Sequence, residues 1–215
     1  MSNVADILND DDFFAETEKS TSTKETTPKP QWTPFADGEY FGHLVDVEKR
    51  TVDTHGGKHK ALVYNFMVKV ANENSTNEYI YPWGNTTYTA SGSEYVGKNI
   101  KAIGVFKFLN PNTKEGDTFS PNPDGNKRYV LFCENIGVEL PTSKREINGE
   151  EVTVKALPTL TEKDITGAPV IAVVGEGRKY TNRNGKEVTP KEVKFVKAWK
   201  EGKKLETVDE ADIPF

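Results

Sequence analysis

A basic stretch in the last fifth of the chain holds the residues best suited to binding a ligand. Residues 178–191 contain five cations, a single carboxylate at Glu187 and an aromatic ring at Tyr180. Lysine and arginine neutralise phosphates and release counterions, and an aromatic ring stacks on a base of any identity. The pattern therefore favours a single-stranded nucleic acid as ligand, and a solvated hairpin tip is the alternative. The five cations are Arg178, Lys179, Arg183, Lys186 and Lys191.

Two further groups of residues could extend such a surface. The first is Tyr79, Tyr81 and Trp83, which fall on one face of an expected strand and either stack on bases or belong to the core. The second is a set of cations that could line the opposite wall of a groove. This set consists of Lys49, Arg50, Lys58 and Lys60. Phe195 and Trp199 are expected in the core.

Few residues could perform catalysis. His55 and His59 are four apart, but the two glycines between them argue against a helix, and no ligand joins them at metal spacing. The single cysteine, Cys133, permits no internal disulfide and is expected to be a small buried group. A phosphate-binding glycine loop is absent. The sequence therefore predicts a protein that is not an enzyme and that uses no metal or cofactor.

The chain ends in Asp209-Glu210-Ala211-Asp212-Ile213-Pro214-Phe215. Pro214 prevents a helix and biases Ile213 to an extended form, so the segment cannot bury its apolar residues locally. A partner groove with an apolar pocket for Phe215 and a basic rim for the carboxylates would capture it. The alternative is a solvated tail. The residues expected to contact a partner protein are Asp209, Glu210, Asp212, Ile213, Pro214 and Phe215.

This ending resembles the acidic tip of bacterial-type single-stranded DNA-binding proteins, the SSB family. A phage-type protein similar to this family is expected. The resemblance covers residues 209–215. It implies that the protein binds and protects single-stranded DNA during replication, recombination or repair, with little sequence specificity. It also implies that the tip recruits a polymerase, helicase, primase or nuclease, and it leaves a homo-oligomer open.

Two other functional classes fit the same sequence. One is an adaptor that binds only proteins through acidic and aromatic ends, since residues 10–14 resemble the C-terminal tip. The other is an acidic nuclease inhibitor or DNA mimic. Binding to a single-stranded oligonucleotide that weakens steeply with salt separates the first interpretation from both.

The negative net charge of the chain does not exclude a nucleic-acid ligand. The 215 residues carry a formal charge of -5, from 28 basic and 33 acidic residues. Residues 1–34 and 201–215 together hold 5 of the basic and 12 of the acidic residues, which leaves 23 basic and 21 acidic residues for positions 35–200. A near-neutral core can still have a basic face. No apolar run is long enough to span a membrane, and no signal sequence begins the chain. We therefore expect a cytoplasmic protein, in the host cell if a phage encodes it.

The order of expected elements predicts the fold. Apolar alternation indicates strands over 41–47, 62–70, 78–89 and 193–199, and residues 170–174 form a continuous apolar run. Helical spacing appears over 102–109 and again over 129–136, where Gly137 is placed as a C-cap, although Gly104 and the β-branched residues also fit strands. Asn184-Gly185 is the strongest hairpin signal, and a small hairpin is expected around Asn148-Gly149.

Three strands, a helical insertion and a final two-stranded hairpin match an OB-fold. This fold is a mainly β, five-stranded, partly open barrel with a helix between its third and fourth strands. Its loop between strands four and five, here the basic stretch, forms one wall of the nucleic-acid groove. The expected organisation is a disordered acidic, Ser/Thr-rich tail at 1–34, an OB-fold-like domain at 35–200 and an acidic tail at 201–215.

Overall fold

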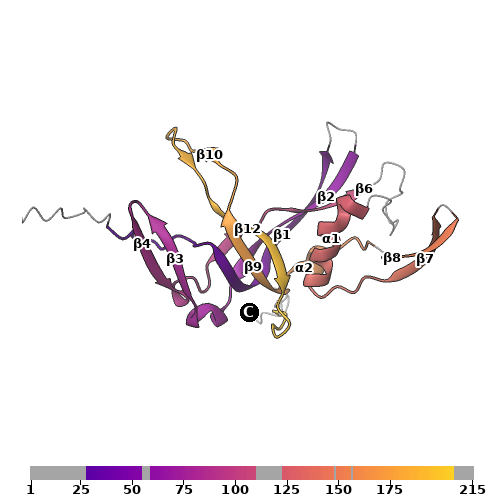
Figure 1. Ribbon diagram of the computed structural model, residues 1–215, viewed down its shortest axis with the longest axis horizontal. Coiled ribbons are helices and arrows are strands. Elements are labelled where there is room, and N and C mark those ends of the chain that lie inside the picture. The colour runs from indigo at the N-terminus through magenta and orange to yellow at the C-terminus, as the bar shows by residue number, and fades with distance from the viewer. Residues whose placement is uncertain (1–27, 55–58, 110–122, 148, 156, 206–215) are drawn as a thin grey trace, which may run out of the picture.

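The computed structural model of the protein describes residues 28–54, 59–109, 123–147, 149–155 and 157–205. This described part of the chain is mainly β, with two α-helices and two 3-10 helices (Figure 1). The strands are β1 (Gly38–Thr54), β2 (His59–Val70), β3 (Glu78–Trp83), β4 (Thr86–Ser91), β5 (Asn99–Lys101), β6 (Val105–Leu109), β7 (Thr142–Ile147), β8 (Glu150–Lys155), β9 (Pro169–Glu176), β10 (Tyr180–Thr181), β11 (Glu187–Val188) and β12 (Lys191–Ala198). The helices are α1 (Pro123–Asn135), α2 (Glu162–Ile165), η2 (Asn72–Thr76) and η3 (Gly92–Glu94).

Six strands form the central sheet. Their order is β12-β9-β1-β2-β5, and β6 also pairs with β2, next to β5. Every ladder in this sheet is antiparallel. Three hairpins, β3–β4, β7–β8 and β10–β11, form separate two-stranded sheets that extend from the body in different directions (Figure 1). The central sheet therefore positions all three arms.

The inward face of β1 is set by its even-numbered residues. Tyr40 and Leu44 are fully buried, whereas Phe41 between them is only half-buried on the outer face. Gly42 lies between the two buried side chains, and a Cβ there would come within 2.5 Å of Val68 Cγ1. Glycine at this position therefore permits the close approach of β1 and β2.

A register shift between Val45 and Glu48 divides β1 into two halves. Asp46, within the shift, adopts a φ of 51°, a left-handed conformation that aspartate tolerates better than most residues. Such a bulge bends the strand and increases its twist. The first half of β1 pairs with both β2 and β9, and the second half pairs with β2 alone. The second half of β1 thus leaves the sheet in a ribbon with β2 and β6.

The two ends of the central sheet meet next to β5. Ala102 forms an isolated parallel bridge with Val193 of β12, and the Ile103 N–H donates to the Val193 carbonyl oxygen at 3.0 Å. Since β5 and β12 are the last strands of the sheet order, this bridge curls the sheet toward itself. One bridge does not close the described strands into a barrel.

A buried asparagine joins the central sheet to the β3–β4 arm. The Asn74 amide is fully buried, and its Oδ1 accepts the Phe41 N–H at 3.0 Å. Its Nδ2 donates to the carbonyl oxygens of Phe41 at 2.6 Å and Ala71 at 2.9 Å, and the Tyr79 hydroxyl lies 3.0 Å from Oδ1. One side chain therefore connects β1, the end of β2 and β3.

Stacked tyrosines form the core between β1 and the β3–β4 arm. The rings of Tyr40 and Tyr79 lie parallel with centroids 4.2 Å apart, and the ring of Tyr95 meets both edge-on. Burial raises the pKa of Tyr40 and Tyr79, and it raises the pKa of Tyr95 to about 12. All three hydroxyls therefore stay neutral in the folded protein over the physiological pH range.

Helix α1 ends in a Schellman motif, as the position of Gly137 predicted. Gly137 has a φ of 80°, the Gly137 N–H donates to Glu134 O at 3.1 Å, and the Val138 N–H donates to Cys133 O at 2.9 Å. The helix places Tyr129 and Phe132 on the core, where they stack on Tyr64 and Phe66 of β2. Helix α1 therefore covers one face of the β2 strand.

A buried lysine holds the segment that follows β8. Lys107 Nζ donates to the carbonyl oxygen of residue 157 at 2.9 Å and to Thr159 Oγ1 at 2.8 Å. The Tyr129 and Tyr64 hydroxyls donate to the carbonyl oxygens of residues 158 and 160. Burial lowers the pKa of Lys107. Residues 157–160 are thus fixed to β6, β2 and α1 by polar side chains inside the core.

Several predicted elements are confirmed. The fold is mainly β, β1 and β2 form a hairpin, and the alternation over 62–70 marks the buried face of β2. The helical spacing over 129–136 lies within or next to α1, and hairpin β7–β8 brackets the predicted turn at 148–149. The final hairpin is also present, since β9 and β12 pair antiparallel.

The prediction of a helix over 102–109 is wrong. Residues Val105–Leu109 form β6, which pairs with β2 along its whole length. The apolar spacing fits both a helix and a strand, and a partner strand far away in the sequence decided between them. Gly104, which a helix interior disfavours, was the local sign of the strand.

The expected strand count and helix position also differ from the structure. Twelve strands occur in the described residues, and the run at 78–89 is a hairpin of two strands with a turn at Gly84. In chain order no helix separates β3 from β4, and α1 follows β6. Phe195, expected in the core, is 55% exposed, and Trp199 is half-buried against Phe41.

The described body extends past both expected boundaries at residues 35 and 200. The Tyr95 hydroxyl donates to Pro34 O at 2.9 Å, and Trp32 packs edge-on against Trp83. At the other end the Leu205 N–H donates to Gly167 O at 2.9 Å. Residues 32–34 and 203–205 therefore belong to the body, and residues 1–27 and 206–215 of the expected tails lie outside the described residues.

Replacing Asn74 with alanine should destabilise the protein by about 3 kcal/mol. The change leaves the Phe41 N–H of β1 without its acceptor, at a cost of about 1–3 kcal/mol, and it also removes the hydrogen bonds of Asn74 to Ala71 O and the Tyr79 hydroxyl. Urea unfolding measures the loss, and Asn72→Ala in the same 3-10 helix, where the side chain is exposed, is the matched control. The control should change stability by less than about 0.5 kcal/mol. Equal losses of stability in both variants would show that the hydrogen bonds of the Asn74 amide do not stabilise the fold.

Candidate nucleic-acid interface

The turn of the β10–β11 hairpin is built by one asparagine. Asn182 Oδ1 accepts the N–H groups of Asn184 and Lys186, each at 3.0 Å, and the Gly185 N–H donates to Asn182 O at 3.0 Å. Gly185 adopts a φ of 74°, which glycine adopts without strain. The turn predicted at Asn184-Gly185 is confirmed. We call residues 177–190 the basic hairpin.

The basic hairpin presents cations that have no carboxylate partner. Tyr180 is 53% exposed, and the four cations of the hairpin are exposed and form no ion pair with another described residue. These four are Arg178, Lys179, Arg183 and Lys186. Lys191 differs, because it is half-buried at the start of β12 and its Nζ lies 2.8 Å from Asp37 Oδ1. The structure thus brings the four predicted cations and Tyr180 together and assigns Lys191 to an ion pair.

The cations predicted near the first hairpin do not share one face. Residues 48–54, 59–64 and 105–109 form the ribbon, a three-stranded extension of the central sheet. In the β1–β2 ladder Lys49 is the cross-strand neighbour of Tyr64, and Lys60 is the cross-strand neighbour of Asp53. Both lysines therefore lie on the face of the ribbon where Tyr64 stacks on Tyr129 of α1. Arg50 pairs with Val63 and lies on the opposite face. Lys58 lies outside the described residues.

An aromatic pair that the sequence did not indicate lies on the same face as Arg50. Phe106 and Phe108 are half-buried, and their rings stack with centroids 6.1 Å apart and planes 19° apart. Phe106 pairs with Val63, the partner of Arg50, and Phe108 pairs with Ala61. Cross-strand partners lie on one face of a sheet. This ribbon face consists of Arg50, Val52, Ala61, Val63, Phe106 and Phe108.

The basic hairpin and the ribbon both project from the central sheet. In the view of Figure 1 the loop at β10 and the ends of β1 and β2 rise on the same side of the body. The bend in β1 and the length of β9 and β12 produce this arrangement. The basic hairpin and the ribbon, each of which carries exposed cations, therefore project on the same side of the body in this view.

Two of the three predicted aromatic residues of β3 belong to the core. Tyr79 is 6% exposed and Tyr81 is 1% exposed, so neither offers a ring face to a ligand. Trp83 is half-buried and has Trp32, 62% exposed, against its ring at 6.0 Å. Stacking on a base requires an accessible ring. Tyr79 and Tyr81 are therefore no part of an exposed binding surface. Trp83 contacts Trp32, which precedes the expected domain.

No protein family, curated protein or solved structure matches this chain. In the described part of the chain, no helix is both long and apolar enough to cross a membrane, and no three metal-binding side chains cluster. Burial raises the pKa of Cys133 to about 11, so this thiol is neutral at physiological pH.

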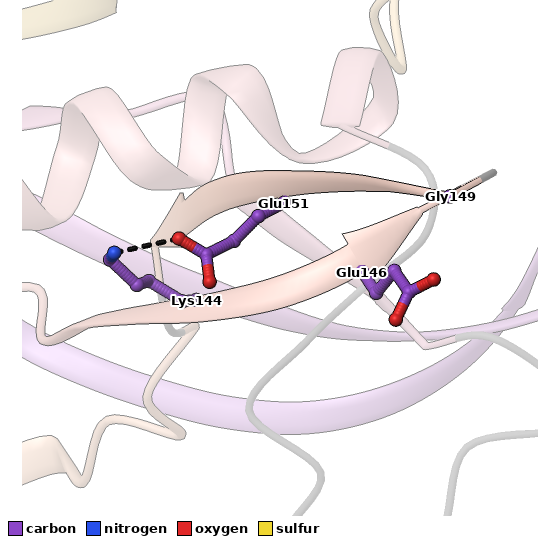
Figure 2. A pocket seen from close by; sticks show the side chains of 4 residues that line it. All are labelled: Lys144, Glu146, Gly149 and Glu151. Atoms are coloured by element: carbon purple, nitrogen blue, oxygen red, sulfur yellow. Dashed lines mark hydrogen bonds and ion pairs between the residues drawn. The ribbon is translucent and has the colours of Figure 1, made fainter.

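A pocket on the β7–β8 hairpin has the wrong chemistry for phosphate. Figure 2 shows it lined by Lys144, Glu146, Gly149 and Glu151, with Lys144 Nζ 2.6 Å from Glu151 Oε1. The lysine is already paired, and Glu146 adds a further negative charge. This pocket therefore offers a phosphate no unpaired cation among its lining residues. The predicted protein-contact residues Asp209 to Phe215, and His55, lie outside the described residues.

Two conservative substitutions in β3 should have opposite outcomes. The Tyr81 hydroxyl is buried and has no hydrogen-bond partner among the described residues, so Tyr81→Phe removes an unsatisfied group and should leave stability unchanged or raise it. The Tyr79 hydroxyl lies 2.8 Å from Glu39 O, and Tyr79→Phe should cost about 1–3 kcal/mol. Thermal and urea unfolding of both variants measure the difference. A loss in Tyr81→Phe equal to that in Tyr79→Phe would contradict the core assignment of these hydroxyls.

Proposed function

We propose that this protein binds single-stranded DNA, largely without regard to sequence, during replication, recombination or repair. The basic hairpin is the observation that carries the proposal. Its four cations have no ion-pair partner among the described residues, and Tyr180 lies exposed between them. Unpaired cations beside an exposed ring suit a ligand with a phosphate at every step and a base of any type.

We also propose that the central sheet is an OB-like, partly open barrel, a fold that suits this function. The order β1-β2-β5/β6-β12-β9 returns to β1, with a parallel contact between Ala102 and Val193 and α1 between β6 and β9 in the chain. An OB-fold binds oligonucleotides across its second and third strands and the loops after its first and fourth strands. In this chain those positions correspond to the ribbon face and the basic hairpin.

The ribbon face supplies a second contact in this proposal. Arg50 is exposed on β1, and the stacked rings of Phe106 and Phe108 lie on β6, with β2 between the two strands. A base stacked on the Phe106 ring would place its phosphate near this positively charged face. Lys49 and Lys60 are left out, since they lie on the opposite face of the ribbon.

We further propose that residues 209–215 recruit enzymes of DNA metabolism and that the protein itself catalyses no reaction. The support is the sequence alone, in which three carboxylates precede Ile-Pro-Phe. Such a segment fits a groove with an apolar pocket and a basic rim on a partner protein. The host cytoplasm is the compartment that this role requires.

Replacing Arg183 and Lys186 with alanine should weaken binding to all single-stranded sequences alike. Each lost phosphate contact should also flatten the plot of log affinity against log salt by about 0.7 unit. Fluorescence anisotropy with a labelled oligothymidylate at several salt concentrations measures both effects. The matched control is Lys127→Ala with Arg128→Ala, an exposed lysine and arginine on α1.

The control should leave both affinity and slope unchanged. If the hairpin and α1 variants behave alike, the basic hairpin is only a solvated turn. A wild-type protein that fails to bind the oligonucleotide would favour an adaptor or a DNA mimic instead.

Deleting residues 206–215 should tighten DNA binding at low salt and have little effect at high salt. The segment carries four carboxylate side chains that compete with phosphates, and screening at 1 M salt shortens their reach to about 3 Å. Phe215→Ala is the matched variant, because it keeps the charges and removes the apolar anchor. It should lose partner enzymes in a pull-down from host extract while DNA binding stays unchanged. Retention of the same partners by both variants would end the recruitment proposal.

A further inference from the structure

Phe195 is an exposed aromatic residue in the middle of β12, a strand that contributes two buried valines to the core. It is 55% exposed, while Val193 and Val196 of the same strand are 1% and 4% exposed. Alternation alone would place Phe195 on the same side as Val193. A local irregularity of β12 therefore determines where this ring lies.

The irregularity is a bulge opposite Val173. Val193 pairs with Val174, and Phe195 pairs with Val173, so Lys194 and Phe195 together occupy the place of one residue. Both are exposed. The Lys194 side chain lies over Gly175, where a Cβ would meet its Cγ at 3.4 Å. Bulges redirect side chains and are frequent beside functional sites. This one puts a cation and a phenyl ring on the outer face of the sheet.

The charges around this pair are mixed. β12 starts three residues after β11, so Lys194 and Phe195 lie next to the base of the basic hairpin. Two nearby carboxylates are already paired, Asp37 with Lys191 and Glu39 of β1 with Lys197. Glu176 and Glu192 are the remaining carboxylates on the facing parts of β9 and β12. The cations that form no ion pair with a described residue are Lys194 and the four of the basic hairpin, and these could bind an anion beside the ring.

We propose that Phe195 is a stacking site for a base of the single strand held by the basic hairpin, with Lys194 bound to an adjacent phosphate. This inference rests on the proposed function and extends its binding surface from the hairpin onto the outer face of β12. The ligand is a base of any identity, since a phenyl ring offers only its face. A partner protein or a second copy of the chain is less suited, because β12, the facing part of β9 and the basic hairpin together carry five cations and three carboxylates that form no ion pair with a described residue.

The experiment compares two probes. One is a labelled oligothymidylate, and the other is an abasic oligomer of equal length, which has the phosphates and no bases. Phe195→Ala should weaken binding to the oligothymidylate about 5- to 150-fold without changing the salt slope, and should not affect the abasic oligomer. Phe195→Trp should restore binding. Lys194→Ala should weaken both probes and flatten the salt slope.

Ile80→Ala is the matched control for Phe195→Ala. Ile80 is 66% exposed on β3, so its truncation removes a similar exposed apolar group elsewhere. Neither variant should shift the melting temperature appreciably, because both side chains are exposed.

The remaining outcomes separate this inference from the function on which it rests. If the wild type binds the oligothymidylate and Phe195→Ala binds it equally well, Phe195 is no stacking site, although the DNA-binding function stands. An equal loss on both probes, or a change in the oligomeric state by light scattering, also overturns the inference. Failure of the wild type to bind either probe overturns the function itself.

Discussion

The bend in β1 is the constraint on which the other parts of this structure depend. A strand that paired with β2 and β9 along its whole length would keep both neighbours in one sheet. The shift between Val45 and Glu48 instead releases the second half of β1 from β9, so that β2 and β6 form the ribbon with it. Gly42 keeps the first half close to β2, and Asn74 then fixes that half to the β3–β4 arm. The positions of the arms follow from how one strand divides its hydrogen bonds.

The basic hairpin is held together by its turn rather than by its charged side chains. Asn182 accepts two backbone N–H groups, and only two residue pairs join β10 to β11. Exposed charges contribute little to stability even when they are paired, and the four cations on this hairpin form no ion pair with a described residue. Folding therefore gains little from their identity, and the binding role proposed above gives them a physical purpose. The same reasoning applies to Phe195, since an exposed ring contributes less to the core than a buried one.

Local patterns in the sequence predicted the elements whose causes are local. The Schellman motif needs Gly137 after an apolar helix face, and the hairpin turn needs Asn184-Gly185, so both could be read directly. Phe106 was assigned to a helix because its pairing with Val63 involves a strand more than forty residues away. Phe195 was assigned to the core because a bulge changes the side on which a residue lies, and alternation cannot register it. The candidate site was thus predictable at the hairpin and hidden wherever distant strands or a bulge decided which face a side chain occupies.

The tyrosine cluster makes the interior of this protein sensitive to alkali. In the unfolded chain each phenol would lose its proton near its ordinary pKa of 10.0, whereas burial raises the pKa of Tyr40, Tyr79 and Tyr95 in the fold. A raised pKa contributes stability that is fully present below that ordinary value and is lost as the pH rises toward the folded value. Lys107 acts in the opposite direction, because its lowered pKa makes the unfolded chain the better proton acceptor. Since three phenols oppose one amine, strongly basic solution should loosen the contact between β1 and the β3–β4 arm from within the core.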